Sequence, residues 1–312
     1  MTNKNKMILI MGCTASGKGK LAFEIAKRTG GSIISIDSMK VYRRMNIGTA
    51  KPDTQRLKEV KHYLIDVVEP SESFSMGRYI ELADQAIDQL RDTTEGPIIA
   101  AGGTAMYIRG LLEGIFQGES SNPEIRDKLE AQAKEQGLNA LFERLKIIDP
   151  VSASRIHIND KKRIIRALEV FEVTGKPLST QQTQFRSGNY RYPWQLIGLQ
   201  REKTDGNHRM NMRVKKMISD GLIEEVRSLL DEPDGLSKQA AQAVGYAEII
   251  KYFDGQWTLD EAIEKIKINT RRFGKNQRTW YRSFNDVNWF DVAQDQTAEG
   301  LADEVMCNFF NP

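Results

Sequence analysis

The stretch Met7-Ile8-Leu9-Ile10-Met11-Gly12-Cys13-Thr14-Ala15-Ser16-Gly17-Lys18 decides the fold, because an apolar run leads directly into a glycine-rich loop that ends in lysine. The spacing G-x-x-x-x-G-K is typical of loops whose backbone N–H groups surround phosphate oxygens, while the lysine and the next helix N-terminus supply positive charge. A helix-like pattern follows at residues 20–28, as this motif requires. The sequence therefore predicts that a polyphosphate binds at Gly12, Cys13, Thr14, Ala15, Ser16, Gly17, Lys18 and Gly19.

The composition is that of a globular protein. The chain has 312 residues, of which 40% are hydrophobic and 28% charged, which suits one substantial core and a second, smaller lobe. No run approaches the roughly 20 apolar residues that span a bilayer, so we expect a cytoplasmic protein with no membrane partner. Cys13, Cys307 and three scattered histidines support neither a disulfide framework nor a zinc site. With a formal net charge of +3, a nucleic-acid partner has to be argued from local clusters.

Six short apolar runs alternate with helix-like segments, at residues 7–11, 33–36, 63–68, 98–101, 196–199 and 287–292. This pattern predicts an α/β fold with a P-loop-type, mostly parallel sheet flanked by helices. Between 119 and 192 polar helices replace the strands, with Asn122 and Asn159 as expected N-caps and Gly175 near a C-terminus. We therefore predict a core of residues 1–118 and 193–312 and an all-helical insertion domain at 119–192.

Two polar residues follow predicted strands at the sheet edge where ligands bind in such folds. Asp37 follows the second run, and its carboxylate could help hold Mg²⁺, accept a proton from a nucleophile, or only cap a helix or lie in a surface loop. Thr104 follows Gly102-Gly103, and its hydroxyl could donate to a reacting oxygen or cap the helix at 105–112. Both residues are expected at the same edge as the phosphate loop.

Basic residues recur on one face of a C-terminal helix. Arg271, Lys275, Arg278 and Arg282 are spaced by four, three and four residues, with no acid between them. An ordinary solvated face mixes signs, so this face, with Trp280 and Tyr281 in the same stretch, suits RNA. Trp280 fits equally well as a core residue, because it continues the apolar series Ile263, Ile266, Thr270 and Phe273. Two further clusters, which could join the first in one electropositive channel, are Arg209, Arg213 and Lys216, and Lys161, Lys162, Arg163 and Arg166.

Motifs along nearly the whole chain resemble those of the tRNA dimethylallyltransferase family. The loop at 12–18 is similar to the family's G-P-T-A-S-G-K, residues 37–42 to D-S-M-Q-V-Y, and residues 47–52 to I-G-T-A-K-P. Residues 102–108 resemble G-G-T-G-L-Y-I, residues 122–126 the segment that opens the insertion, and residues 163–175 R-x-x-R-A-L-E-V-x-x-x-T-G. Residues 242–246 resemble Q-A-I-G-Y, and residues 275–282 K-R-Q-x-T-W-F-R. Several of these motifs are not shared by phosphate-loop proteins in general.

The resemblance implies an enzyme that transfers a dimethylallyl group from dimethylallyl diphosphate to N6 of the adenosine 3′-adjacent to the anticodon, with Mg²⁺ as cofactor and a tRNA anticodon stem-loop as partner. The diphosphate would occupy the loop, Asp37 would be the general base, and Thr104 would contact the reacting groups. Nothing demands an oligomer, so we expect a monomer. The residues expected to contact tRNA are Asp37, Ser38, Met39, Lys40, Thr104, Arg126, Lys162, Arg163, Arg166, Gln242, Gly245, Tyr246, Lys275, Arg278, Trp280 and Arg282.

Three positions depart from the family pattern. Cys13 replaces a proline, with little expected effect. Lys40 replaces a glutamine expected to help recognise the nucleic acid, and its ammonium can engage phosphate but cannot accept a hydrogen bond. Gly19 stands where Ser or Thr usually places a hydroxyl on Mg²⁺. We predict no protein ligand for the metal and expect Mg²⁺ to be held through the diphosphate and water.

Three other functions compete with this interpretation. A prenyltransferase that acts on free AMP or ADP would use the same loop, although the basic helix and the insertion favour RNA. A small-molecule kinase is disfavoured by the missing hydroxyl at Gly19 and the lack of an arginine-rich lid. A catalytically impaired paralogue that only binds RNA would explain Gly19 and Lys40, whereas the presence of Lys18, Asp37 and Thr104 favours an enzyme.

Overall fold

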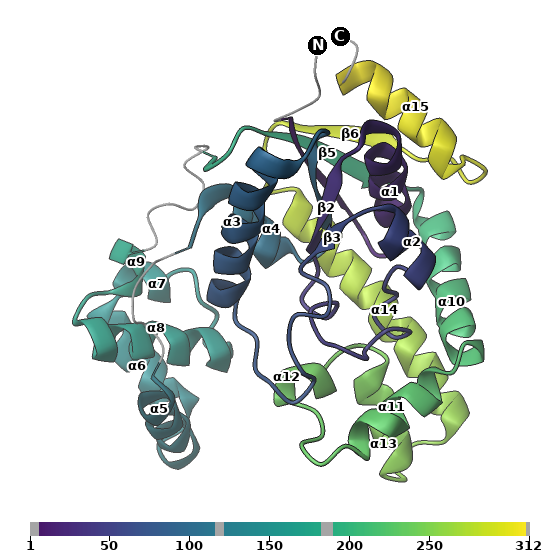
Figure 1. The fold of residues 1–312 in the computed structure, drawn as a ribbon. Helices are drawn as coiled ribbons and strands as arrows, with labels where there is room; N and C mark the ends of the chain where they lie inside the picture. Colours follow the sequence, from purple (N-terminus) through teal and green to yellow (C-terminus); the bar gives the residue numbers. More distant parts are fainter. Residues whose placement is uncertain (1–5, 116–121, 182–189, 310–312) are drawn as a thin grey trace. The chain divides into compact units, whose positions relative to one another are not determined.

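A six-stranded sheet forms the centre of the computed structural model, which describes residues 6–115, 122–181 and 190–309 (Figure 1). The strands are β1 Met7–Gly12, β2 Ser32–Ile36, β3 His62–Tyr63, β4 Ile98–Gly102, β5 Trp194–Gln200 and β6 Val287–Asp291. Their order is β3-β2-β4-β1-β5-β6, and every neighbouring pair is parallel. The predicted α/β fold with a mostly parallel sheet is confirmed.

The third apolar run departs from the prediction. Residues 63–68 were expected to form a strand, but β3 ends at Tyr63. Leu64 and Asp66 have φ angles of 60° and 54°, in the left-handed region that no strand can contain. The chain therefore turns away, and Val68 makes only an isolated parallel bridge with Tyr42.

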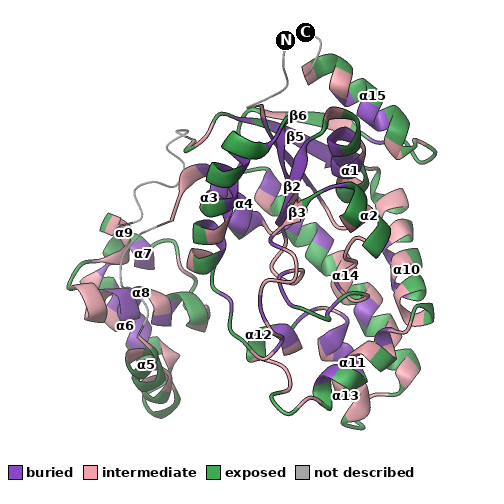
Figure 2. Cartoon of the chain, viewed as in Figure 1, coloured by how far each residue is buried: buried purple, intermediate pink, exposed green. Residues whose placement is uncertain are grey.

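Helices cover both faces of the sheet. On one face, α1 (Lys18–Thr29) and α15 (Ala298–Phe309) bury residues such as Leu21 and Val305 in one cluster with Ile8 and Ile10 of β1. Since side chains alternate along a strand, the intervening residues of β1 face the other side, where α3 (Met76–Thr93) and α14 (Leu259–Tyr281) pack against the sheet. Figure 2 shows the central strands as buried, which explains why they read as continuous apolar runs. The other helices of this part are α2 Thr54–Glu59, α4 Ala105–Glu113, α10 Lys203–Ser219, α11 Leu222–Leu230, α12 Lys238–Ala241 and α13 Tyr246–Phe253.

The chain divides into two compact units. The first comprises Met1–Leu112 and Tyr190–Pro312 and contains the sheet, and the second is the helical segment Glu113–Asn189. Within the first unit, the backbone N–H of Arg191 donates to the carbonyl of Leu112 at 2.8 Å, so the two ends of the sheet-bearing chain meet. Of the predicted insertion at 119–192, residues 119–121 and 182–189 lie outside the described part of the chain.

The helical unit has its own small core. Its helices are α5 Pro123–Glu135, α6 Leu138–Ile148, α7 Pro150–Ala153, α8 Lys161–Thr174 and α9 Leu178–Gln181, and they enclose Leu129, Leu145, Ile164 and Leu168. Asn122 caps α5 as predicted, and Gly175 ends α8 with a φ of 69°. The predicted Asn159 cap is wrong, because the carboxylate of Asp160 accepts the Arg163 N–H and caps α8 instead. None of the helices described in either unit is long and apolar enough to cross a membrane.

Candidate active site

The phosphate loop joins β1 to α1. Ala15 and Gly17 have φ angles of 63° and 104°, and this left-handed geometry curls the backbone so that successive N–H groups converge. Ser16 N–H donates to the Cys13 carbonyl, but the N–H groups of Ala15, Gly17 and Lys18 have no hydrogen-bond partner among the residues described. These free donors at the N-terminus of α1 form a concave site for an anion.

Lys18 adds a positive charge to this site. Its Nζ donates to the Cys13 carbonyl at 3.2 Å. Burial lowers the pKa of Lys18 to about 8, and repulsion by Arg213 and Lys40 contributes, while Asp37 opposes the shift. Burial also lowers the pKa of Lys40 itself. Cations that repel one another in this way are relieved when an anion binds between them, so the site is prepared for a highly charged ligand.

Asp37 lies immediately after β2, and its carboxylate organises the following turn. Its Oδ1 accepts hydrogen bonds from Met39 N–H at 2.9 Å and Lys40 N–H at 3.3 Å. Asp37 therefore has a structural role in its loop, as the sequence analysis allowed, but this role uses only Oδ1 of the carboxylate. Oδ2 of Asp37 makes no hydrogen bond within residues 6–115, 122–181 and 190–309, so it is available to accept a proton.

Thr104 connects the ends of β2 and β4. Its Oγ1 accepts a hydrogen bond from Ser38 N–H at 3.1 Å, so in this structure it orients the Asp37 turn rather than caps α4. The Ile36 carbonyl accepts from the N–H groups of Gly103 and Thr104. A Cβ on Gly102 would lie 2.0 Å from that carbonyl oxygen, which explains the glycine. The ends of β1, β2 and β4 thus bring together the loop, Asp37 and Thr104, as the sequence predicted for one sheet edge.

Two positions have roles in the site that the sequence analysis did not predict: Gln277 was not singled out there, and the expectation that Tyr281 offers aromatic surface to RNA is wrong because its side chain is buried. Gln277 of α14 accepts from Thr14 N–H through Oε1 and donates to the Gly103 carbonyl through Nε2, both at 2.8 Å. The hydroxyl of Tyr281 lies 3.0 Å from the Gly12 carbonyl oxygen and 3.1 Å from that of Gly103. Both side chains are buried. The only signal in the sequence is that residues 274, 277 and 281 recur on one helical face beside the basic residues.

The apolar face predicted for α14 is partly wrong. Phe273 is 45% exposed, and the buried face instead continues from Ile266 to Gly274, Gln277 and Tyr281. Trp280 is half-buried beneath Arg109, whose guanidinium carbon lies 5.3 Å from the ring centre. Trp280 is therefore neither a fully buried core residue nor a free aromatic surface.

A cavity of about 400 Å³ adjoins the phosphate loop. Its apolar wall comes from Leu199, Met210, Tyr281, Phe284 and Trp289, and its polar wall includes Thr14, Ser16, Arg201 and Arg278. The hydroxyl of Ser16 is buried without a hydrogen-bond partner in the described chain, next to this space. A cavity with one charged and one apolar wall suits a small molecule with a phosphate head and a hydrocarbon tail.

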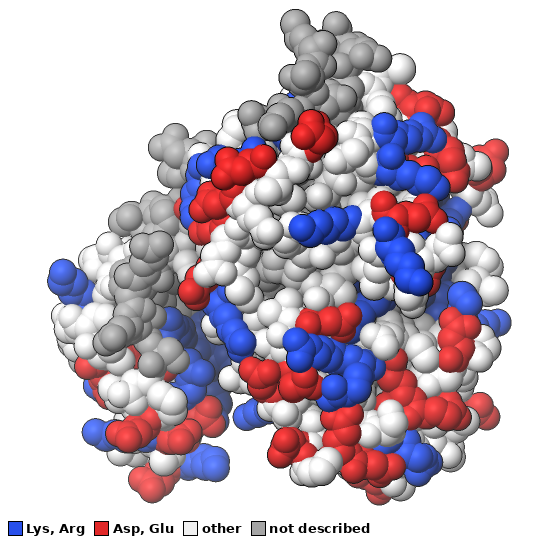
Figure 3. All heavy atoms as spheres, in the orientation of Figure 1, with Lys and Arg blue, Asp and Glu red and all other residues white. Residues whose placement is uncertain are grey.

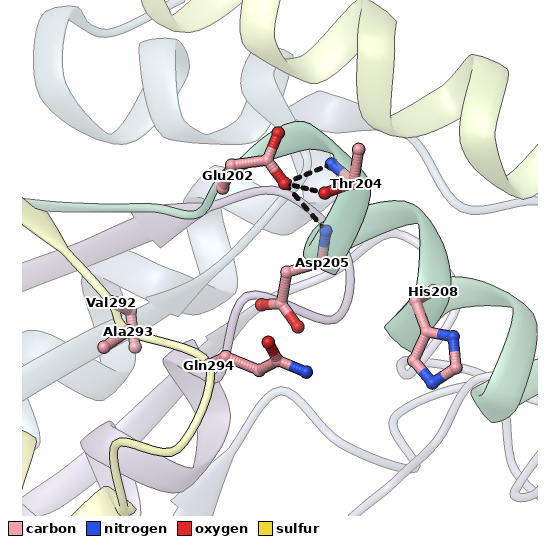
Figure 4. A pocket seen from close by; sticks show the side chains of 7 residues that line it. All are labelled: Glu202, Thr204, Asp205, His208, Val292, Ala293 and Gln294. Carbon is pink, nitrogen blue, oxygen red and sulfur yellow. Dashed lines mark hydrogen bonds between the residues drawn. The ribbon is translucent and has the colours of Figure 1, made fainter.

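Arg201, which follows β5, supports the phosphate loop through hydrogen bonds. Its Nε donates to the Ser16 carbonyl at 3.0 Å, and its Nη1 reaches Asp205 and the carbonyls of Val292 and Ala293. A second hollow of about 380 Å³ is lined by Asp205, Val292 and Ala293, which accept these hydrogen bonds, and Figure 4 shows its lining residues. There Glu202 accepts from the N–H groups of Thr204 and Asp205 and so caps α10. We assign this second hollow to support of Arg201 and α10.

The predicted basic clusters differ in how many of their side chains form ion pairs. In the cluster on α10, Arg209 pairs with Asp205 and Lys216 with Asp220, whereas Arg213 faces the phosphate loop, with Nη1 3.5 Å from Oγ1 of Thr14. On α14, Lys275 and Arg282 are exposed and Arg278 is half-buried, and none of the three has an ion-pair partner in the described residues. On the face of the molecule that Figure 3 shows, Lys and Arg side chains are interspersed with Asp and Glu side chains.

Two basic residues of the helical unit pair with one buried acid, whereas Lys161 lies near Glu130 and Arg163 near Asp160. Glu169, 0% exposed, pairs with Arg126 at 2.7 Å and with Arg166 at 3.0 Å. Lys162 and Arg163 are exposed at the start of α8. Arg126 and Arg166 therefore have a structural role whatever else they bind, since an unpaired buried carboxylate would be costly.

The predicted segment from Gln242 to Tyr246 combines surface and core. Gln242 is exposed, and Gly245 has a φ of 101° at the start of α13. Tyr246 is 0% exposed, and its hydroxyl donates to Glu225 at 2.6 Å. Because Glu225 also accepts the N–H groups of residues 46–48, Tyr246 supports that loop and its side chain offers no surface to RNA in this structure.

Comparison with known proteins adds an independent line of evidence. Residues 40–284 match the family model described as IPP transferase. The chain is 45% identical to the tRNA dimethylallyltransferase of Acetivibrio thermocellus over 298 residues, which cover 95% of each protein. It resembles the crystal structure of the tRNA isopentenylpyrophosphate transferase of Bacillus halodurans with 37% identity and a TM-score of 0.69, over 97% of this chain and 96% of that one. A eukaryotic dimethylallyltransferase that acts on tRNA, 24% identical, has the same fold with a TM-score of 0.83, over 98% of this chain and 79% of that one.

Proposed function

Since this chain belongs to the IPP transferase family, we infer that it transfers a dimethylallyl group from dimethylallyl diphosphate to N6 of the tRNA adenosine 3′-adjacent to the anticodon, with release of diphosphate. The observation that supports this site assignment most is Asp37, which has one unbonded carboxylate oxygen and lies at the same sheet edge as a phosphate loop with free N–H donors. The roles given below to individual residues are part of the same proposal.

The reaction requires a base that accepts a proton from the amine and cationic or N–H groups that stabilise the negative charge of the leaving diphosphate. An exocyclic adenine amine is a weak nucleophile, because its lone pair is delocalised into the ring, and it becomes acidic as the new C–N bond forms. Asp37 accepts that proton through Oδ2, while Thr104 keeps the carboxylate turn in place. As the C–O bond to diphosphate breaks, the N–H groups of the loop, Lys18 and Arg213 stabilise the negative charge of the leaving group.

The cavity beside the loop gives the prenyl donor a binding mode. The diphosphate would lie on the loop at residues 12–19, and the dimethylallyl group against the apolar wall of Leu199, Met210 and Phe284. Exclusion of water there protects the allylic carbon, which gains positive character as diphosphate leaves, from hydrolysis.

RNA is the acceptor that the basic surfaces favour. Lys275, Arg278 and Arg282 at the end of α14 and Lys162 and Arg163 on α8 would bind phosphates, and Gln242 and the half-buried Asp37 turn would contact the nucleotide. Flipping a base costs less in a loop than in a duplex, which favours an anticodon loop. We propose that residues 119–192 form the tRNA-contacting insertion and that the protein acts as a cytoplasmic monomer.

One incubation tests the proposed function. The purified protein is mixed with dimethylallyl diphosphate, Mg²⁺ and an unmodified tRNA with adenosine beside its anticodon, and the digested nucleosides are weighed. A prenylated adenosine is the expected product, and AMP in place of tRNA should give none. Prenylated AMP would identify a free-nucleotide enzyme, and tRNA binding without product would identify an impaired paralogue.

We propose that Mg²⁺ reaches this site with the diphosphate. The described residues contain no group of three or more His, Cys, Asp or Glu side chains that could hold a metal, and Gly19 offers no ligand. We infer that the diphosphate and water, rather than a cluster of protein side chains, would hold the metal. When bound, Mg²⁺ would neutralise part of the diphosphate charge.

Gly19→Ser should lower the Mg²⁺ concentration that gives half-maximal activity. A Cβ at position 19 meets no atom within 4 Å, so serine fits without strain and places a hydroxyl where related loops ligate Mg²⁺. The measurement is a Mg²⁺ titration of prenyl transfer, with Gly19→Ala as the matched control. Identical midpoints for the serine and alanine variants would show that the hydroxyl does not reach the metal.

Replacing both Arg278 and Arg282 with alanine should flatten the salt dependence of tRNA binding. Loss of two phosphate contacts is expected to reduce the slope of log K against log salt by about 1.4 to 1.8. Lys58→Ala with Lys61→Ala, two exposed lysines near β3, makes the same change in net charge and should leave the slope unaltered. If both double variants give the wild-type slope, the RNA backbone does not contact this part of α14.

A further inference from the structure

The side chain of Gln277 bridges two loops of the active site. It is 4% exposed, and its amide links Thr14 of the phosphate loop to Gly103 beside Thr104, with both hydrogen bonds 2.8 Å long. The partners lie 263 and 174 residues away in sequence. One amide thus holds together the loops that follow β1 and β4.

The chemistry of both contacts specifies an amide. Thr14 N–H needs an acceptor and the Gly103 carbonyl needs a donor, and a glutamine side chain supplies one of each. A Cβ at position 103 would lie 2.4 Å from Nε2, so Gly103 leaves room for this bridge. Tyr281, one turn further along α14, adds a hydroxyl between the Gly12 and Gly103 carbonyls.

The position of the bridge indicates what it does. Thr14 N–H is used by Gln277, and the next loop N–H groups without a partner in the described chain, at Ala15, Gly17 and Lys18, are those that can bind diphosphate. Fixing Thr14 therefore sets the direction of the donors that follow it. Lys275 of the same helix and Arg282, which follows it, are exposed, so the buried and exposed residues of this segment have different roles.

We propose that Gln277 is a positioning residue that holds the phosphate loop in its diphosphate-binding conformation, and that it does not contact RNA although it lies within the basic segment 275–282. This inference rests on the proposed function, because it assigns the loop to the diphosphate of the prenyl donor. Gln277 would thus have a different role from the residues around it in segment 275–282 that are expected to bind tRNA.

The test compares diphosphate and tRNA binding in the same variants. Gln277→Met keeps the size of the side chain but loses both hydrogen bonds, and Gln277→Glu retains the acceptor but cannot donate to Gly103 when ionised. Both should weaken inorganic pyrophosphate binding, measured by calorimetry, and raise the KM for dimethylallyl diphosphate about 10-fold. The Kd for tRNA should stay within about twofold of wild type. Gln256→Met, the same substitution at an exposed glutamine, should change none of these values.

The opposite pattern would overturn the inference: unchanged pyrophosphate affinity together with weaker tRNA binding would make Gln277 an RNA contact. If thermal melting shows that neither Gln277 variant folds, Tyr281→Phe removes only the second support and should still weaken pyrophosphate binding several-fold; wild-type pyrophosphate affinity in that variant would count against the proposal. The calorimetric titration needs no prenyl transfer. An inactive wild-type protein would therefore refute the proposed function and leave this inference to be decided by pyrophosphate binding.

Discussion

Replacing Asp37 with asparagine should lower kcat for prenyl transfer by about 10²- to 10⁴-fold, the usual contribution of a general base. Asparagine is nearly isosteric, and its amide oxygen can still accept the Met39 and Lys40 N–H groups that Oδ1 of Asp37 accepts now. The turn is therefore expected to persist, and only the proton acceptor is lost. The measurement is steady-state transfer of a labelled dimethylallyl group at saturating tRNA and dimethylallyl diphosphate.

Two controls separate catalysis from structure in this experiment. Asp53→Asn makes the same change at a carboxylate that also accepts a backbone N–H, from Arg56, but caps α2 outside the site, and it should retain wild-type activity. The Kd of the Asp37 variant for tRNA should change little. Wild-type turnover in Asp37→Asn would remove Asp37 from the role of base.

Replacing Lys18 with methionine should reduce kcat/KM for dimethylallyl diphosphate by about 10²- to 10³-fold, comparable to the loss of one preorganised donor at a developing charge. Methionine preserves the packing of the long side chain but removes the ammonium beside the Cys13 carbonyl. Lys20→Met, at an exposed position two residues along α1, is the matched control and should behave like wild type.

The pH dependence provides a second signature of Lys18. Its pKa in the free protein is lowered to about 8, so the ammonium is present below that pH and is lost above it. Since kcat/KM reports on the free enzyme, it should fall in wild type as the pH rises through about 8. Lys40→Gln removes one repelling cation and should move this alkaline limb to higher pH, whereas Lys18→Met should lack it. An alkaline limb that persists unchanged in Lys18→Met would belong to another group.

The central strands β1, β2 and β4 could be predicted because they are buried on both faces and therefore read as apolar runs. The strand predicted at residues 63–68 is wrong because of contacts with another segment of the chain. The N–H groups of Asp66 and Val67 donate to the carbonyls of Lys40 and Val41, and these contacts hold residues 64–66 in a conformation that Leu64 rarely adopts alone. A turn imposed by a distant segment cannot be read from local pattern.

The difference between local motifs and contacts of distant segments also explains which residues of the site could be predicted. The phosphate loop is local, since its glycines, its lysine and the helix that follows form one continuous motif. Asp37 and Thr104 could be placed because the carboxyl ends of parallel strands share one edge. The roles of Gln277 and Tyr281 were not predicted because residues within a basic helix indicate a surface, and only tertiary contacts across more than 260 residues bury them.

The hydrogen bond between Arg191 N–H and the Leu112 carbonyl has a consequence for how this protein could have evolved and how it can be altered. The chain leaves the sheet-bearing unit and returns to it at adjacent points, and none of the residues described in between belongs to a strand of the sheet. A different segment inserted between these two points need not change the order of the strands in the sheet. The entropic cost of closing such a loop rises only slowly with its length. We therefore expect that the helical segment can be lengthened or exchanged for that of a relative without rearranging the sheet, a change that would alter acceptor recognition if this segment contacts tRNA as proposed.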